Sequence, residues 1–235
     1  MRKIQLKQVL RNKRFVLFTI ILPIGWYIFF DQLQKGVSPS ILLGIAVFIG
    51  VIGNSLATFS KRIASDIGFY SFESQFTSYS VKNYLWDQSI VQLILNSLIF
   101  LAVLVVAVLG FHFPVTTSLL VQFFLLSLMG IYFSVIGFVL GVRVDAKTID
   151  TIGFPVIILA AMTIIPFDTL GASGGFMDLV GKLQRVFPGY YYTKLIQDLT
   201  EKQTIDATQL ALFVAVFGLN LLFFYLLVPK GEMGN

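Results

Sequence analysis

The feature of this sequence that most restricts its fold is a series of six apolar runs separated by polar segments. The runs are Phe15–Phe30, Ile41–Phe59, Ile90–Phe111, Leu119–Val142, Ile152–Phe167 and Leu210–Val228. A helix needs about 20 residues to cross the hydrocarbon core of a bilayer. Four runs fit that length, whereas the first and the fifth are short. The pattern predicts an all-α integral membrane protein with six transmembrane helices.

The composition agrees with this fold class. Only 12% of the residues are charged and 57% are hydrophobic, whereas a soluble domain has about 25% charged residues. We therefore expect residues 1–235 to form a single membrane domain. The first apolar run leads into no small-residue cleavage site, so we expect it to be a retained helix and not a signal peptide.

The distribution of basic residues predicts which side of the membrane each polar segment faces. With an inner N-terminus, the inner segments are 1–14, 60–89, 143–151 and 229–235, and together they hold twelve of the 17 lysines and arginines. Cytoplasmic segments carry an excess of these residues, so we expect both termini to be cytoplasmic. The net charge of +5 is then a consequence of topology, and we expect no nucleic-acid partner.

Residues 1–14 have the periodicity of an amphipathic helix. The two kinds of side chain fall on separate faces, with Lys3, Lys7, Arg11 and Arg14 on one and Leu6, Val9 and Leu10 on the other. This pattern is typical of an interfacial helix on anionic lipid. The alternative is a plain topology signal with no helix on the surface.

Residues 60–89 form the longest polar interval on the predicted cytoplasmic side. The interval begins with the basic pair Lys61–Arg62, continues with an aromatic-rich run predicted to be helical, and ends with Tyr84 and Trp86 as interfacial anchors. A protein that only spans the membrane needs no such loop. A protein that receives force from a soluble partner does.

Polar and small residues recur inside several predicted spans. Span three carries Gln88, Gln92 and Asn96 at i, i+4 and i+8 on one face, and span two carries Asn54 and Ser55. Span four has a seam of small residues at Ser127, Gly130, Ser134, Gly137 and Gly141. Small residues let helix backbones approach closely, so the seam indicates helix packing. For Asn54, Ser55, Gln92 and Asn96, helix packing and a polar translocation path both remain open.

The segment 168–208 separates the short fifth span from the last one. Val180, Leu183, Val186 and Phe187 recur at helical spacing, Pro188–Gly189 interrupts the pattern, and Tyr190–Ile196 resumes it. Two short helices after a shortened span predict a re-entrant hairpin that dips into the outer leaflet. Backbone at that depth must be buried in protein or line a cavity. The alternative is an ordinary extracellular loop.

No group of residues has the pattern of a catalytic or metal site. The chain has no cysteine and one histidine, His112, so neither thiolate nor histidine ligation of a metal is expected. Gly181–Lys182 ends like a phosphate-binding loop but lacks its first glycine and its Ser or Thr. No predicted span has a charge near its centre, which argues against an ion-coupled transporter built on buried carboxylates. We expect no catalytic residue and no bound cofactor, so the energy for transport has to come from a partner.

Three segments together resemble the permeases of type-2 ABC exporters, six-helix membrane subunits that pair with a separate ATPase. They are the basic run RNKRFVLFTIILPIGWYIFF with Pro23, the loop KRIASDIGFYSFESQFTSYSVKNY, and Pro166 followed by FPGYYYTKLIQDL before the last span. Their order and spacing cover almost the whole chain. The family often has an acidic-Arg pair and a following glycine in the loop. Here the pair is Lys61–Arg62, followed by Asp66 and Gly68.

The resemblance implies that residues 60–89 contain a coupling helix that docks on the ATPase. The residues it assigns to that contact are Lys61, Arg62, Asp66, Gly68, Phe69, Phe72, Glu73 and Phe76. It further implies that residues 1–14 form a connecting helix and that the hairpin in 168–208 caps the exit. Spans one, two and five of two facing copies would line the pathway.

The resemblance also implies partners, location and cargo. The partners would be two ATPase subunits, which bind ATP and Mg²⁺, a second permease copy in a homodimer, and membrane lipid. The location would be the bacterial cytoplasmic membrane. A high aromatic content, with 24 Phe and 9 Tyr, agrees with export of an amphipathic or hydrophobic cargo such as a peptide antibiotic, a drug or a lipid. Two other classes stay open, an ATPase-independent pore or secondary transporter and a membrane enzyme, although the enzyme would need paired acids or a histidine site.

Overall fold

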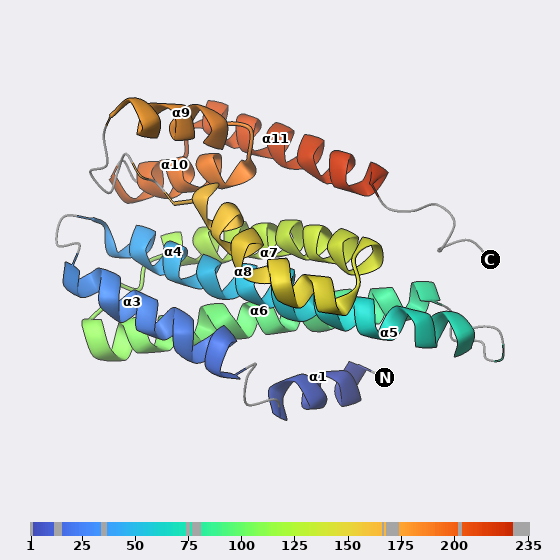
Figure 1. Cartoon of the computed structure of the whole chain (residues 1–235). Coiled ribbons are helices and arrows are strands. Elements are labelled where there is room, and N and C mark those ends of the chain that lie inside the picture. The colour runs from blue at the N-terminus through green and yellow to red at the C-terminus, as the bar shows by residue number, and fades with distance from the viewer. Residues whose placement is uncertain are drawn as a thin grey trace.

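The computed structural model is a bundle of helices and describes residues 2–11, 16–33, 37–73, 76, 81–165, 167, 174–201 and 204–227. Every regular element in this part of the chain is a helix. Figure 1 shows most of them running side by side along one axis, with the short α1 (Arg2–Arg11) at the edge of the bundle. The all-α prediction is confirmed.

Within the described residues, four helical stretches are long and apolar enough to cross a membrane, namely Pro39–Phe69, Trp86–Phe111, Ser118–Arg143 and Ala207–Leu226. They correspond to the second, third, fourth and sixth predicted spans, so the chain has the character of an integral membrane protein. The first predicted span contains the short π-helix η1 (Leu17–Ile21) and α3 (Leu22–Leu33). The fifth is α8 (Ala146–Met162), also a shorter helix. A membrane crossing by these two segments stays a prediction.

The second predicted span lies at the centre of the bundle. α4 (Pro39–Ile52) begins with proline at its first position, where the missing N–H costs no helical hydrogen bond. In the most apolar window of this span 78% of the residues are buried, against 6% for α11 (Ala207–Leu226). α6 (Val81–Phe111) and α7 (Ser118–Arg143) pack against α4. α4 is therefore the core helix, and α11 is peripheral.

The small residues of α7 bring its backbone against the second span. A Cβ atom on Gly137 would overlap the carbonyl oxygen of Ser55, and one on Gly141 would lie 2.7 Å from Cβ of Ile63. A Cβ on Gly130 would lie 2.8 Å from Nδ2 of Asn96. The predicted packing seam is confirmed at these three glycines, which leave no room for a side chain.

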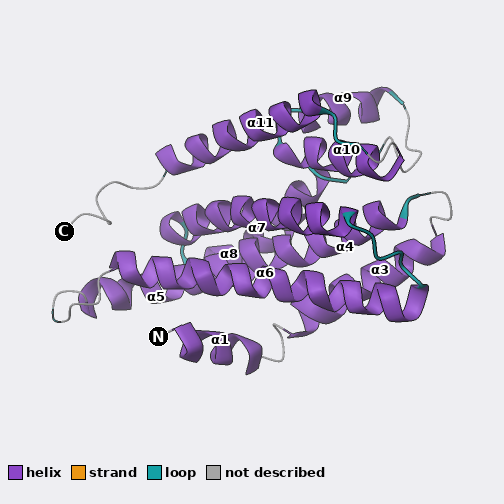
Figure 2. Cartoon of the chain, turned by 180° about the vertical axis from the view of Figure 1, so that it is seen from behind, coloured by secondary structure: helices purple, strands orange, loops and turns teal. Residues whose placement is uncertain are grey.

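Two sets of contacts define the ends of the bundle. At one end Lys61 pairs with Asp150 of α8, and Nε of Arg143 donates to the carbonyl of Leu227, 2.6 Å away, at the end of α11. We call this the charged end. At the opposite end Nε2 of Gln122 on α7 donates to the carbonyl of Ser40 on α4, 2.7 Å away. Figure 2 shows the same arrangement from behind.

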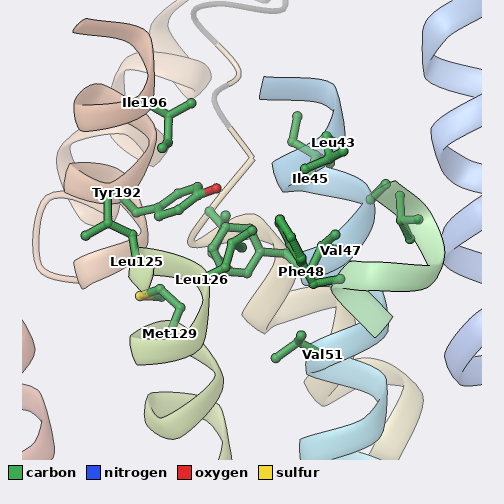
Figure 3. Packing of buried hydrophobic residues seen from close by; sticks show 14 of the residues in the cluster. Leu43, Ile45, Val47, Phe48, Val51, Leu125, Leu126, Met129, Tyr192 and Ile196 are labelled. Carbon is green, nitrogen blue, oxygen red and sulfur yellow. The ribbon is translucent and has the colours of Figure 1, made fainter. Parts of the chain in front are cut away.

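α10 (Pro188–Glu201) is fixed to the core through Tyr192. Figure 3 shows this ring beside Phe48 of α4, with Leu125 and Met129 of α7 near it. The centroids of the Tyr192 and Phe48 rings are 4.7 Å apart in an edge-to-face arrangement, and only 3% of Tyr192 is exposed. Edge-to-face aromatic pairs are favourable beyond the area that they bury, so α10 is part of the core.

The hairpin of α9 (Gly175–Gln184) and α10 closes the end of α8. Nε2 of Gln184 donates to the carbonyls of Met162, 2.7 Å away, and Ile165, 2.8 Å away. Oγ1 of Thr193 donates to the carbonyl of Ile164 at 3.2 Å. The last carbonyls of a helix have no partner inside that helix. Gln184 supplies a donor to the carbonyl of Met162, the last residue of α8, and Gln184 and Thr193 supply donors to the two carbonyls of the turn that follows. α8 can therefore end at Met162 without leaving its carbonyls buried and unpaired.

The two short helices predicted in 168–208 are confirmed, with one difference. Pro188 does not interrupt a helix but is the first residue of α10, and the break lies at residues 185–187. The turn between the helices reaches far along α11, because Nδ2 of Asn220 donates to the carbonyl of Val186 at 3.0 Å. Asn220 is about 20 Å along α11 from its N-cap Asp206. Pro166 and residues 168–173 lie outside the described part.

Replacing Gln184 with methionine tests the closure of α8. The change keeps the length of the side chain but removes both hydrogen-bond donors, so we expect a loss of about 1–3 kcal/mol in the free energy of unfolding. Titration with a denaturing detergent measures it. Gln197→Met is the matched control, because Gln197 donates to Glu201 at 3.0 Å and accepts from Lys194 at 3.5 Å, both on its own helix, and bonds to no carbonyl at the end of α8 among the described residues. Equal effects of the two changes would contradict the closing role of Gln184.

Residues 60–89 are more helical than the predicted loop. The π-helix η2 (Gly53–Phe59) follows α4 without a gap and is itself followed by α5 (Ser60–Glu73). α6 then begins at Val81. No proline and only one glycine, Gly68, interrupt residues 60–73, so nothing in the sequence ends the helix at the membrane surface.

The N-terminal helix is confirmed over Arg2–Arg11, and residues 12–15 lie outside the described part. Its residues Leu6 and Val9 pack against Val91 and Leu95 of α6. The apolar face of α1 is thus attached to the bundle. Its predicted position in the membrane interface stays a prediction.

Candidate functional site

The first candidate site is the part of α5 and α6 that extends past the charged residues of the bundle. The helix from Pro39 to Glu73 is about 50 Å long at about 1.5 Å per residue. The hydrocarbon core of a bilayer is only about 30 Å thick. Lys61 is the first charged residue on this helix, so the turns after it extend beyond the apolar part of the bundle. We call these turns and the start of α6 the projecting tip.

Lys61 and Asp150 mark the level at which the tip begins. Nζ of Lys61 lies 2.7 Å from Oδ1 and 2.5 Å from Oδ2 of Asp150, and the side chains are 45% and 57% exposed. An exposed pair of this kind contributes about 0–1 kcal/mol. Its main consequence is geometric, because it holds α5 beside the first turns of α8.

Arg62 points into the bundle. Its NH2 nitrogen donates to Oε1 of Gln92 at 3.4 Å, and its guanidinium carbon lies 5.6 Å from the centre of the Phe59 ring. The side chain is half-buried. Arg62 and Lys61 were both predicted to contact a partner, but the structure engages both of them within the chain. That either also contacts a partner stays a prediction.

The aromatic residues predicted at the tip are exposed. Phe69, Phe72 and Phe76 have exposed fractions of 63%, 62% and 72%. The rings of Phe72 and Phe76 lie 5.0 Å apart, which makes them a pair. A group of exposed aromatic side chains on a projecting element is typical of a protein-docking surface.

The other predicted tip residues lie on the same helix. Asp66 is half-buried, whereas Gly68 is exposed and a Cβ on it would meet nothing within 4 Å. Glu73 is the last residue of α5, and only its backbone is described. All eight predicted tip residues are therefore brought to one projecting segment, and among those whose side chains are described Lys61, Gly68 and the three phenylalanines are exposed.

The second candidate site is a buried cluster of amides and hydroxyls beside η2. Nδ2 of Asn54 donates to Oδ1 of Asn96 at 3.0 Å, and Nε2 of Gln92 donates to Oγ of Ser55 at 3.2 Å. Gln92 also donates to Oδ1 of Asn96 at 3.4 Å. The four residues are at most 5% exposed. The structure thus joins all four predicted pathway residues in one network, which we call the amide cluster.

α7 contributes two groups to the amide cluster that the sequence did not single out for this role. Nδ2 of Asn96 donates to the carbonyl of Gly130 at 3.4 Å, and the hydroxyls of Ser55 and Ser134 lie 3.4 Å apart. Both residues were predicted as packing positions. Their spacing on α7 carries no signal for a bond to α6 or η2, because only the fold brings those helices together.

The π-helix explains why two consecutive residues of the second span reach the cluster. Asn54 and Ser55 both lie in η2, where each turn holds an extra residue. Short π segments inside α-helices occur frequently at functional sites. Oδ1 of Asn54 accepts no hydrogen bond from the described residues. The cluster thus has one spare acceptor.

The amide cluster consists of amides and hydroxyls, with the guanidinium of Arg62 bonded to Gln92 at its edge. Amides and hydroxyls do not titrate near neutral pH, and Arg62 remains charged. Among the described residues no group of three or more histidine, cysteine, aspartate or glutamate side chains could hold a metal ion. What the cluster can do is hold three helices in one arrangement through bonds that a different arrangement could exchange.

Replacing Asn96 with leucine tests this network. The change removes the acceptor used by Asn54 and Gln92 and the donor to Gly130, so we expect a loss of about 1–3 kcal/mol in the free energy of unfolding. The double variant Asn54→Leu/Asn96→Leu should lose less free energy of unfolding than the sum of the two single variants. The reason is that Asn54→Leu also removes the donor that Asn96→Leu leaves without its acceptor. Strictly additive losses would contradict a direct bond.

Comparisons with protein-family models, with curated proteins and with solved structures give no match to this chain.

Proposed function

We propose that the chain is the membrane-spanning permease subunit of an ATP-driven ABC exporter. The observation that carries the proposal is the projecting tip. One unbroken helix runs from the core of the bundle, through the amide cluster, to a surface of exposed aromatic rings well past Lys61. A soluble ATPase that binds this surface would hold a rigid lever connected to the centre of the permease.

The mechanism follows from the rigidity of that lever. Transport needs two discrete arrangements of the bundle that ATP binding biases. When the ATPase subunits close, the tip moves with them, and η2 is the point at which the second span can change register. The bonds of Asn54 and Ser55 to α6 would then be exchanged for others. On this proposal the four amide-cluster residues become accessible to the pathway in one of the two arrangements.

The topology proposed is six spans with both termini at the charged end in the cytoplasm. The bond from Arg143 to Leu227 supports it, because it brings the end of α11 to the same end as the tip. The bond from Asn220 to Val186 supports a re-entrant α9–α10 hairpin, because that turn would stand deep in the membrane. Gln184 and Thr193 would donate hydrogen bonds to the carbonyls at and just after the end of α8 at that depth, where no water is available.

The proposed assembly is a homodimer of permeases with two ATPase subunits, which bind ATP and Mg²⁺. The pathway would lie between the two copies. The proposed cargo is an amphipathic or hydrophobic molecule, such as a peptide antibiotic, a drug or a lipid, moved outward across a bacterial cytoplasmic membrane. The exposed apolar surface of α3 and α8, with Phe29, Phe154 and Leu159 at 51%, 73% and 64% exposure, supports a lipid-facing or copy-facing role for these helices.

Co-purification tests the proposal. The tagged chain is extracted from its native membranes in mild detergent, and bound proteins are identified and assayed for ATP hydrolysis. We expect a soluble ATPase in about equal amount, with an activity that changes when the permease is removed. A chain that purifies alone and is indifferent to ATP would overturn the proposal and leave the ATPase-independent pore or secondary transporter.

A further inference from the structure

The N-terminal helix α1 presents a basic face away from the bundle. Its apolar residues Leu6 and Val9 are used in packing against Val91 and Leu95 of α6. Lys7 and Arg11, one turn apart, are exposed. Attachment to α6 therefore fixes the direction in which these charges point.

Neither Lys7 nor Arg11 forms an ion pair with a described residue. The first acidic residue of the sequence is Asp31, which lies near the far end of α3. A group of positive charges without counter-charges attracts anions from its surroundings.

The contact with α6 also sets the depth of the basic face. Asp87 is the last charged residue of α6 before its apolar part, and Val91 and Leu95 follow it by about 6 and 12 Å along the helix. α1 thus lies at the level where the charged residues of α6 give way to its apolar part. In the proposed topology that level is the lipid headgroup region. Leu10, beside Arg11, is 38% exposed and stands at the border of the basic and apolar faces.

We propose that the Lys7–Arg11 face of α1 binds the headgroups of anionic lipids. A guanidinium forms two parallel hydrogen bonds to a phosphate, and an ammonium attracts it as a point charge. Each such residue near an anionic surface changes the preference for an anionic lipid by about fivefold. The site belongs to α1 and α6 of one chain and does not depend on an ATPase or on transport.

Tryptophan quenching by brominated lipids measures this preference directly. The chain has two tryptophans, Trp26 on α3 and Trp86 near the start of α6. Trp26→Phe leaves Trp86, which is 66% exposed, as the reporter on α6, five residues before Val91 in the α1 contact. The protein is reconstituted in zwitterionic phosphatidylcholine mixed with brominated phosphatidylglycerol or brominated phosphatidylcholine. We expect the anionic lipid to quench Trp86 several-fold more effectively, and increasing salt to reduce the difference.

Two charge-matched variants localise the effect. Lys7→Gln/Arg11→Gln should abolish most of the preference, whereas Lys182→Gln/Arg185→Gln, which removes the same charge from α9 and the turn after it, should leave it unchanged. Lys7→Arg/Arg11→Lys keeps the charge and should keep the preference, which separates lipid binding from a folding defect. Equal quenching by the two lipids, or equal losses in both glutamine variants, would overturn the proposal.

Discussion

Replacing Gly137 with leucine is expected to prevent α7 from packing against the second span. A Cβ at this position would overlap the carbonyl oxygen of Ser55 and lie 2.9 Å from the carbonyl carbon. The obstacle is backbone, so no side-chain rotation relieves it. Overpacking typically costs about 1–3 kcal/mol, and we expect Gly137→Leu to lie at or above the top of that range. The thermal transition of the protein in detergent measures the loss.

Gly218→Leu is the matched control for this change. Gly218 lies in the middle of α11, and a Cβ on it would meet nothing within 4 Å. A side chain there replaces glycine in a helix, which is neutral or slightly favourable. An unaltered transition in Gly137→Leu would contradict the close approach of α7 to η2. A large loss in Gly218→Leu would show that the bundle responds to any bulky residue.

The second large effect is expected when Phe72 and Phe76 are both replaced by glutamate. Both side chains are more than half exposed, so the variant should enter the membrane and keep its thermal transition. Charges in place of two apolar rings should remove the docking surface for the ATPase. We expect loss of the co-purified ATPase and of ATP-driven export together, an effect of at least tenfold in binding because buried aromatic anchors dominate such interfaces.

Phe176→Glu provides the comparison for this prediction. Phe176 on α9 is 66% exposed, much like Phe72 and Phe76, but it lies on the hairpin beyond the end of α8, far along the chain from the tip. The Phe176→Glu variant should still co-purify with the ATPase. Export that continues unchanged in the double glutamate variant would remove the tip from the coupling mechanism.

The spans, and the residues that share one face of a span, could be predicted because both depend on local periodicity. The runs around α4, α6, α7 and α11 are long, so hydropathy alone identifies them. Gln92 and Asn96 fall on one face by helical spacing, and polar groups inside a membrane protein usually point toward other helices. Their burial follows from these two facts. The glycines of α7 were identified as packing positions for the same reason.

Contacts between distant segments could not be predicted in this way. Lys61 and Asp150 are 89 residues apart in the sequence, and each was assigned to its own polar segment. The two bonds from Gln184 to the end of α8 depend on the turn at residues 185–187, and composition does not specify that geometry. The π-helix η2 has no sequence signature either, because the hydrogen bonds that define it depend on packing against α6 and α7.

In the predicted cytoplasmic loop, the helix was predicted but its start was not. The aromatic run was predicted to be helical, but the helix was not expected to continue from the span itself. Polar residues after Ser60 suggested a loop, although no residue before Glu73 stops a helix. The correction strengthens the functional proposal, because a continuous helix transmits displacement better than a flexible connection.

The most direct test of the central claim places a single cysteine at Phe72. The chain has no cysteine of its own, so Phe72→Cys is a unique site for a short photoactivatable crosslinker in native membranes. We predict an adduct with a soluble ATPase that carries a phosphate-binding loop, and none from Phe176→Cys. An adduct of the same protein from both positions, or no ATPase adduct from Phe72→Cys, would contradict the account.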